Sequence, residues 1–85
     1  FVILNNYPNP FNPITTITVH FETNCNASLQ VFDIKGHLIS LLFDGIIESG
    51  TREFHWNGNS QPSGVYFIKL LSDDYSQTRK MVFLK

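Results

Sequence analysis

Apolar and polar side chains alternate along most of the chain with the two-residue period of β-strands. In the segment 15–21, Ile17, Val19 and Phe21 are expected to face a core, and the residues between them to face solvent. The segment 27–31 repeats the pattern with Ala27, Leu29 and Val31 facing inward. No segment shows the 3.6-residue period of an amphipathic helix. The pattern therefore predicts an all-β protein.

The longest apolar run, residues 64–71, is expected to be the central strand. It is rich in the aromatic and branched side chains that favour strands, and Lys69 is its only charged residue. Such a run suits a strand with paired neighbours on both edges. Alternation places Tyr66, Ile68 and Leu70 on one face, which we predict to be the core face because it lacks the lysine.

Shorter strands are expected on either side of this one. One runs from 38 to 43 and is closed by a turn at Asp44-Gly45; another starts at Gly50 and turns Phe54 and Trp56 inward. A turn at Asp73-Asp74 leads into a final strand from 75 to 84. Short strands separated by turn signals predict one domain, an antiparallel sandwich of about seven strands.

The segment Tyr7-Pro8-Asn9-Pro10-Phe11-Asn12-Pro13 carries three prolines. Proline removes backbone donors and disfavours the α conformation in the residue before it, so the segment should be extended. Tyr7 and Phe11 are candidate anchors onto the sandwich. The asparagines are expected to bond their own backbone and hold turns.

Composition excludes several classes of function. The 85 residues carry a net charge of −1, which gives no attraction to nucleic acid or anionic lipid. No stretch approaches the roughly 20 apolar residues of a membrane helix. Residues 1–4 are too short for a signal-peptide core, and the chain lacks an initiator methionine. We therefore expect a fragment or a processed product, with any export signal upstream.

Candidate catalytic and metal-binding residues are few. His20, His37 and His55 have no second ligand at metal spacing, and the aspartates sit in turns, where turn chemistry accounts for them and disfavours a calcium site. Cys25, the only cysteine, lies in an expected turn and cannot form an internal disulfide. We expect no cofactor, metal or small-molecule substrate, and no enzymatic activity. Trp56 and Tyr66 could form a sugar platform, but alternation favours Trp56 in the core.

Several stretches, taken in order, resemble the C-terminal sorting domain of the type IX (Por) secretion system, in its type A form. They are Leu4 to Ile17 with the Tyr7-Pro8-Asn9-Pro10-Phe11 motif, Val31 to Gly36, Trp56-Asn57-Gly58, Ser63 to Phe67, and Thr78 to Lys85. The match covers nearly the whole chain. It departs from the family at two positions. Asn57 stands where aspartate is usual, and the loss of that carboxylate argues against a metal site in this loop. His37 stands where arginine is common.

The resemblance implies an immunoglobulin-like sandwich, a single domain that spans residues 1–85 at the end of a longer protein. The family's partner is an outer-membrane translocon of Gram-negative bacteria. The cargo passes through the periplasm and is secreted or held at the cell surface, often after cleavage of the domain. The resemblance places the sorting signal at Gly64, Tyr66, Lys80, Met81, Val82, Phe83, Leu84 and Lys85.

Two hypotheses remain open from the sequence. The favoured one is a non-catalytic targeting module whose partners are the translocon and the parent protein. The alternative is a structural, assembly or adhesive module that associates with itself through unpaired edge strands. The apolar segment 1–4 would serve as the added strand.

Overall fold

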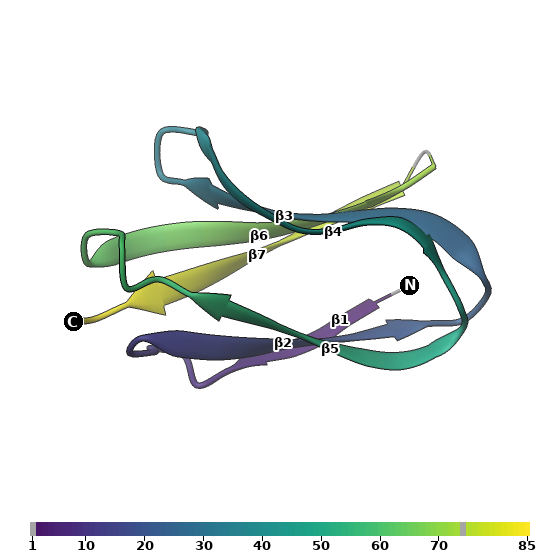
Figure 1. The fold of residues 1–85 in the computed structure, drawn as a ribbon, viewed down its shortest axis with the longest axis horizontal. Coiled ribbons are helices and arrows are strands. Elements are labelled where there is room, and N and C mark those ends of the chain that lie inside the picture. The colour runs from purple at the N-terminus through teal and green to yellow at the C-terminus, as the bar shows by residue number, and fades with distance from the viewer. Residues whose placement is uncertain (1, 74) are drawn as a thin grey trace.

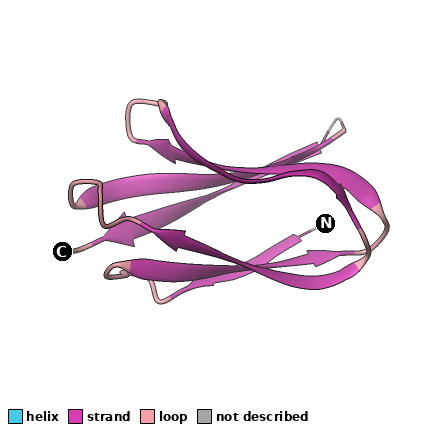
Figure 2. Cartoon of the chain, in the orientation of Figure 1, coloured by secondary structure: helices cyan, strands magenta, loops and turns pink. Residues whose placement is uncertain are grey.

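The computed structural model describes residues 2–73 and 75–85, which form a two-layered β-sandwich (Figure 1). Strands make up most of it, joined by short loops (Figure 2). They are β1 (Val2–Tyr7), β2 (Ile14–Phe21), β3 (Cys25–Asp33), β4 (Leu38–Ile47), β5 (Gly50–Asn57), β6 (Gly64–Ser72) and β7 (Tyr75–Phe83). The predicted all-β sandwich is confirmed. Within these residues, no helix is long and apolar enough to cross a membrane.

The two sheets differ in size and share no strand. One has the order β1-β2-β5 and the other β4-β3-β6-β7, and neighbouring strands are antiparallel. The predicted central strand is confirmed, because β6 pairs with β3 on one edge and with β7 on the other. Strand β7, the last of the chain, lies at an edge of the larger sheet.

The core lies between the sheets and is formed by alternate residues of the facing strands. The inward residues predicted for segments 15–21, 27–31 and 64–71 are all buried. Trp56 is 5% exposed, so it fills the core, and Phe54 is half-buried against it. The fully buried large side chains are Phe11, Phe21, Phe83, Ile17, Leu29, Ile68, Leu70 and Met81.

Two predicted turns are wrong because strand pairing continues through them. Asp44 and Gly45 do not close a strand: they pair with Ser28 and Ala27, and β4 runs on to Ile47. An Asp-Gly pair favours a turn locally, but the ladder to β3 outweighs that preference. Cys25 likewise begins β3 and is a half-buried free thiol rather than a turn residue.

The expectation that Tyr7 anchors the sandwich is also wrong, since its side chain is 74% exposed. The register between β1 and β2 shifts between Ile3 and Asn5. Without this shift, Ile3 and Tyr7 would share the inner face; with it, the inner position passes to Asn6. The shift buries Asn6 Nδ2, which has no hydrogen-bond partner among the described residues.

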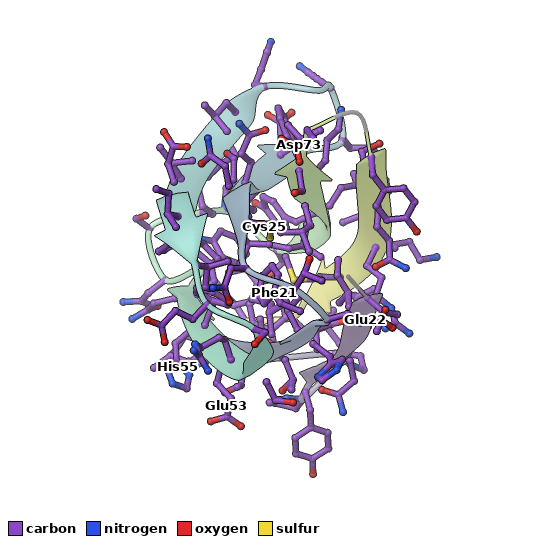
Figure 3. The ribbon with its side chains drawn as sticks, turned by 90° about the vertical axis from the view of Figure 1, so that its right-hand side faces the viewer. Phe21, Glu22, Cys25, Glu53, His55 and Asp73 are labelled. Atoms are coloured by element: carbon purple, nitrogen blue, oxygen red, sulfur yellow. The ribbon has the colours of Figure 1, made fainter. Side chains whose placement is uncertain are left out.

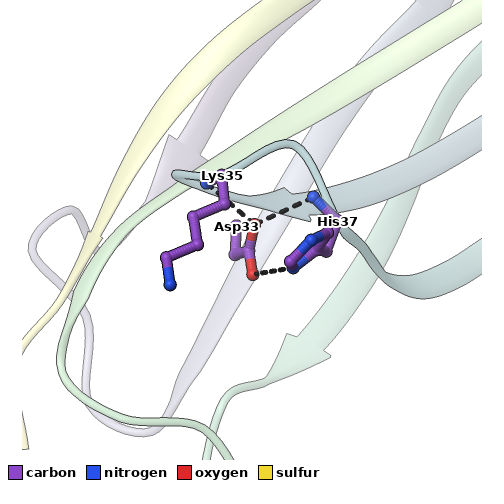
Figure 4. A network of polar contacts seen from close by, with 3 residues as sticks. All are labelled: Asp33, Lys35 and His37. Carbon is purple, nitrogen blue, oxygen red and sulfur yellow. Dashed lines mark hydrogen bonds and ion pairs between the residues drawn. The ribbon is translucent and has the colours of Figure 1, made fainter.

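The turn between β3 and β4 is built around one carboxylate (Figure 4). Asp33 Oδ1 accepts the backbone N–H groups of Lys35 and His37, each at 2.9 Å, and Asp33 Oδ2 lies 3.3 Å from His37 Nδ1. The backbone hydrogen bond from His37 is the largest of the causes that lower the pKa of Asp33. The predicted turn at 33–36 is confirmed. Asp73 lies in the turn predicted before β7, whereas Asp74, like Phe1, is outside the described residues.

We predict that Trp56→Ala lowers the free energy of unfolding by about 3–5 kcal/mol, because it leaves a large cavity in a small core. Chemical denaturation of the two proteins measures the difference. Ile46→Ala is the control: Ile46 is 82% exposed, so this variant should unfold close to wild type. A Trp56→Ala midpoint equal to that of the control would show that Trp56 contributes little to the core.

A second prediction concerns acid. Because folding lowers the pKa of Asp33 from 3.8, its carboxylate stabilises the fold above that value, and the contribution is lost as pH falls through the lower folded pKa. Asp33→Asn retains an acceptor oxygen but cannot titrate. Its free energy of unfolding should therefore fall less than that of wild type between about pH 5 and pH 2. Identical pH profiles of the two proteins would contradict the prediction.

Candidate functional site

Segments far apart in the sequence meet at the end of the sandwich where the chain terminates (Figure 1). This end carries the connector between β1 and β2, residues 8–13, the loop between β5 and β6, residues 58–63, and the end of β7. We refer to the contact between the connector and residues 80–84 as the junction. It brings the proline-rich motif against the last strand.

Four aromatic side chains form the apolar part of this end. Phe11 stacks on Phe83 with ring centroids 5.1 Å apart and meets Trp56 edge-on at 5.6 Å. Trp56 in turn lies 5.2 Å from Tyr66. Each such pair adds about 0.5–1.5 kcal/mol beyond area burial. The cluster thus ties the connector, β5, β6 and β7 together.

Gly58 allows the loop after β5 to close over this cluster. A Cβ atom there would lie 3.3 Å from the Phe83 ring and 3.4 Å from that of Phe11, which is tighter than ordinary contact. The Gly58 N–H donates to the Pro13 carbonyl at 2.9 Å, so the loop and the connector are also joined through their backbones. Asn57 Oδ1 accepts the Asn59 N–H at 2.9 Å and holds the turn locally.

The connector runs beside β7 like a short additional strand. The Phe11 N–H donates to the Val82 carbonyl at 2.9 Å, and the Leu84 N–H donates to the Phe11 carbonyl at 3.1 Å. Asn9 extends this pairing with its side chain: its Oδ1 accepts the Val82 N–H at 3.0 Å, and its Nδ2 donates to the Lys80 carbonyl at 3.4 Å. Asn9 therefore bonds a distant backbone, not its own as we expected.

Further along β7, two side chains tie it to β1 in the other sheet. Gln77 Oε1 accepts the Ile3 N–H at 2.6 Å, and Arg79 Nη1 donates to the Ile3 carbonyl at 2.8 Å. These bonds satisfy backbone groups of an edge strand that β2 does not pair. Together with the junction, they fasten the last strand to the first along one side of the sandwich.

The entrance of β6 contributes the remaining contacts. The Tyr66 hydroxyl donates to the Pro62 carbonyl at 2.6 Å, and Ser63 Oγ accepts the Lys85 N–H at 3.0 Å. Burial, followed by the nearby Asp33 carboxylate, raises the pKa of Tyr66 above its usual value. Gly64 has a φ of +156°, a backbone conformation that L-residues rarely adopt.

The residues predicted to carry the sorting signal fall into two groups. Tyr66, Met81 and Phe83 are buried, and Val82 is half-buried, so they shape the fold beneath the surface. The exposed side chains are those of Lys80, Leu84 and Lys85. The connector residues Pro8, Asn9 and Pro10 are exposed beside them, whereas Tyr7 lies on the outer face of the smaller sheet.

Sequence reasoning missed the residues that join distant backbones. In the sequence, Asn9 has the character of a turn-forming residue, and only the folded structure shows that it lies against β7. Gln77 and Arg79 look like ordinary polar strand residues. Gly58 carries a weak signal, since it follows a buried tryptophan in a short motif.

The opposite end of the sandwich holds an open, largely polar hollow, viewed in Figure 3. Its lining includes Phe21, Glu22, Cys25 and Asp73. The structure, over residues 2–73 and 75–85, contains no cluster of three or more side chains suited to hold a metal ion.

Two of the histidines make cross-strand contacts on the smaller sheet. His55 Nδ1 lies 3.0 Å from Thr16 Oγ1, and His20 Nδ1 lies 3.1 Å from Thr51 Oγ1. Both pairs join β2 to β5.

Comparison with protein families matches residues 5–84 to the secretion system C-terminal sorting domain. Comparison with curated proteins gave no match. The matched range includes the connector, all four aromatic residues of the cluster and β7. The segments that carried the resemblance in the sequence are thus, for the most part, those that meet at the end of the sandwich that holds the junction.

We predict that Gly64→Val destabilises the domain more than Ser63→Val does. No atom lies within 4 Å of an added Cβ at Gly64, so the cost is backbone strain at positive φ, about 1–3 kcal/mol. Ser63→Val removes one exposed acceptor and should cost about 1 kcal/mol or less. Thermal unfolding of the two variants decides the question, and equal melting temperatures would remove the special role of Gly64.

Proposed function

The chain belongs to the family of secretion system C-terminal sorting domains, and on this premise we propose how it is recognised and where it takes its cargo. The domain is a non-catalytic targeting module of type IX secretion. We assign it to the type A form of the family, at the end of a longer exported protein. The parent protein crosses the periplasm of a Gram-negative bacterium and reaches the cell surface or the exterior.

The observation that supports this proposal most is the convergence of the matched segments on the last strand. Phe11, Trp56 and Tyr66 come from three separate motifs and contact one another in series, and Phe11 stacks on Phe83 at the end of β7. A translocon that selects cargo by one domain needs a surface of fixed shape. The end of β7 is such a surface, because its core residues and backbone are held on several sides.

We divide the sorting signal into a supporting part and a contact part. Gly64, Tyr66, Met81 and Phe83 support the shape, and Val82 belongs mainly with them. Lys80, Leu84 and Lys85 are exposed and are the residues that we expect the translocon to contact. Within the described part of the chain, no ion pair involves either lysine, so both charges are available to an acidic partner.

We propose a binding role for the domain and no enzymatic one. At the end of the sandwich that holds the junction, the titratable Tyr66 hydroxyl donates its hydrogen bond to the Pro62 carbonyl. Among the described residues, no histidine lines the hollow at the opposite end, and its cysteine, Cys25, is a free thiol. Because the matched family is one of sorting domains, the proposal includes no catalytic residue and no cofactor.

One observation favours the second candidate, an assembly module. Strand β4 is an edge strand with three exposed apolar side chains, Leu38, Leu41 and Ile46. The segment that we expected to supply the added strand does not fit this role, because Val2 and Ile3 already pair with β2. Size-exclusion chromatography of the isolated chain separates the candidates: a targeting module elutes as a monomer, and an assembly module does not.

The direct test of targeting attaches a reporter protein ahead of residues 1–85 in a bacterium that has a type IX system. The fusion should appear at the surface or in the medium, and a strain without the translocon should retain it in the periplasm. Export that does not depend on the translocon, or no export at all, would contradict the proposal.

We predict that Lys80→Glu combined with Lys85→Glu reduces export while leaving the fold intact. Both side chains are exposed, so the free energy of unfolding should change by no more than about 0.5 kcal/mol per site. Removal of residues 79–85 should also trap the cargo, but it takes away Met81 and Phe83 from the core and is a less specific test.

The matched control for the double variant is Arg52→Glu combined with Lys69→Glu, which changes the net charge equally on other strands. Export of the control should match wild type. If the Lys80 and Lys85 variant folds and is exported as well as the control, the charged end of the chain is not part of the signal.

A further inference from the structure

The backbone edge of β7 at the junction is already occupied. Edge strands are commonly recognised by strand addition, in which a partner pairs with their free N–H and C=O groups. Here Phe11 and Asn9 make four hydrogen bonds to Lys80, Val82 and Leu84. Both backbone groups of Val82 that point away from β6 are used in this way.

Displacing the connector would expose the interior as well as break these bonds. Phe11 is 1% exposed and stacks on Phe83, and its ring also contacts Trp56. A partner that added a strand along residues 80–84 would have to remove this ring from the core. Burying a large aromatic side chain is worth several kcal/mol, so such a partner would oppose a large part of the domain's stability.

We propose that the translocon recognises the connector and the end of β7 together, as one preformed surface. It contacts the side chains of this surface and does not add a strand to β7. This inference rests on the proposed function, since the binding partner is the translocon. The surface, which we refer to as the junction surface, consists of the exposed residues Asn9, Asn12, Lys80, Leu84 and Lys85.

The chemistry of the junction surface defines the partner that fits it. Lys80 and Lys85 form no ion pair with any other described residue, and Leu84, 53% exposed, lies next to Lys85 in the sequence. The connector adds the amide of Asn12, next to the residue that binds the Leu84 N–H. The matching partner is a folded protein surface that presents carboxylates around a small apolar contact. It does not present an unpaired strand.

Asn9 is then a positioning residue for recognition. Its amide holds the connector against Lys80 and Val82, and together with the two backbone bonds of Phe11 it fixes where Asn12 lies relative to Leu84. Asn24 offers a matched comparison at the opposite end of the sandwich. Its Oδ1 accepts one backbone N–H, that of Ser49 at 2.8 Å, without any contact to the junction.

The first experiment maps contacts in the full fusion protein during export. A benzophenone amino acid is placed at Asn12, at Leu84 or, as a control, at Glu22 beside the distant hollow. All three positions are exposed, so the fold should tolerate them. Illumination should cross-link positions 12 and 84 to the same translocon component, and position 22 to none.

The second experiment compares Asn9→Ala with Asn24→Ala. Each variant loses an asparagine bond to a backbone N–H, and Asn9→Ala also loses the 3.4 Å bond to the Lys80 carbonyl, so the binding of each variant is compared at a temperature where melting curves show it fully folded. Asn9→Ala should weaken binding to the solubilised translocon about tenfold, which corresponds to ~1.4 kcal/mol, while Asn24→Ala binds like wild type. Strand addition predicts the reverse, because Asn9→Ala frees the Val82 N–H and should leave binding equal or tighter.

The outcomes separate this inference from the proposed function. Cross-linking from Leu84 but not from Asn12, or undiminished binding by Asn9→Ala, would overturn the junction surface while export still identified a sorting domain. An unsubstituted fusion that is not exported would instead overturn the proposed function itself. Equal losses of binding in Asn9→Ala and Asn24→Ala would assign the effect to stability and would also overturn the positioning role.

Discussion

The packing of Phe11 against Phe83 is the contact on which the rest of the structure depends. It joins a residue near the start of the chain to one near its end, in a parallel bridge flanked by backbone hydrogen bonds. The connector thereby runs from the smaller sheet to the edge of the larger one. Without this contact, Trp56 and Gly58 would lose the Phe11 ring that they pack against, and the end of β7 would keep its pairing with β6 but lose the connector on its other side. Because the contact spans almost the whole chain, it can form only after a large loop-closure cost has been met.

The edges of the two sheets are protected by different means. β1 and β7 are fastened to each other by Gln77 and Arg79, whose side chains bond the backbone of Ile3. β4 pairs with β3 through two shifts of register, which bend an otherwise apolar edge away from a flat template. Such protection matters because a free flat edge would pair with other chains.

The sequence indicated the fold well because alternation and burial agree on most strands. Ile17, Leu29 and Ile68 are buried as their spacing predicts, and β6 is central as its apolar run predicts. The errors arose where a long-range contact overrides a local preference. Asp44-Gly45 favours a turn in isolation but pairs with β3, and the register shift in β1 moves Tyr7 to the outside. The candidate site could be predicted only in part. The sequence identified the last strand, but it could not show that Asn9 bonds this strand, because the two residues in contact are 73 positions apart.

A family signature in a domain of this size combines two kinds of constraint. Phe11, Trp56 and Gly58 hold a shape and are out of reach of any partner, since all three are buried. Lys80 and Leu84 are exposed and hold nothing in the core. If the translocon contacts the surface that we propose, a substitution in the first group acts on recognition only through the shape of the domain, and a substitution in the second acts directly. Asn9 belongs to both groups, because its side chain is exposed and also makes two of the four hydrogen bonds between the connector and β7. On the recognition that we propose, the signal is a property of the folded junction, and the last residues taken as a linear peptide would lack the connector beside which they are displayed.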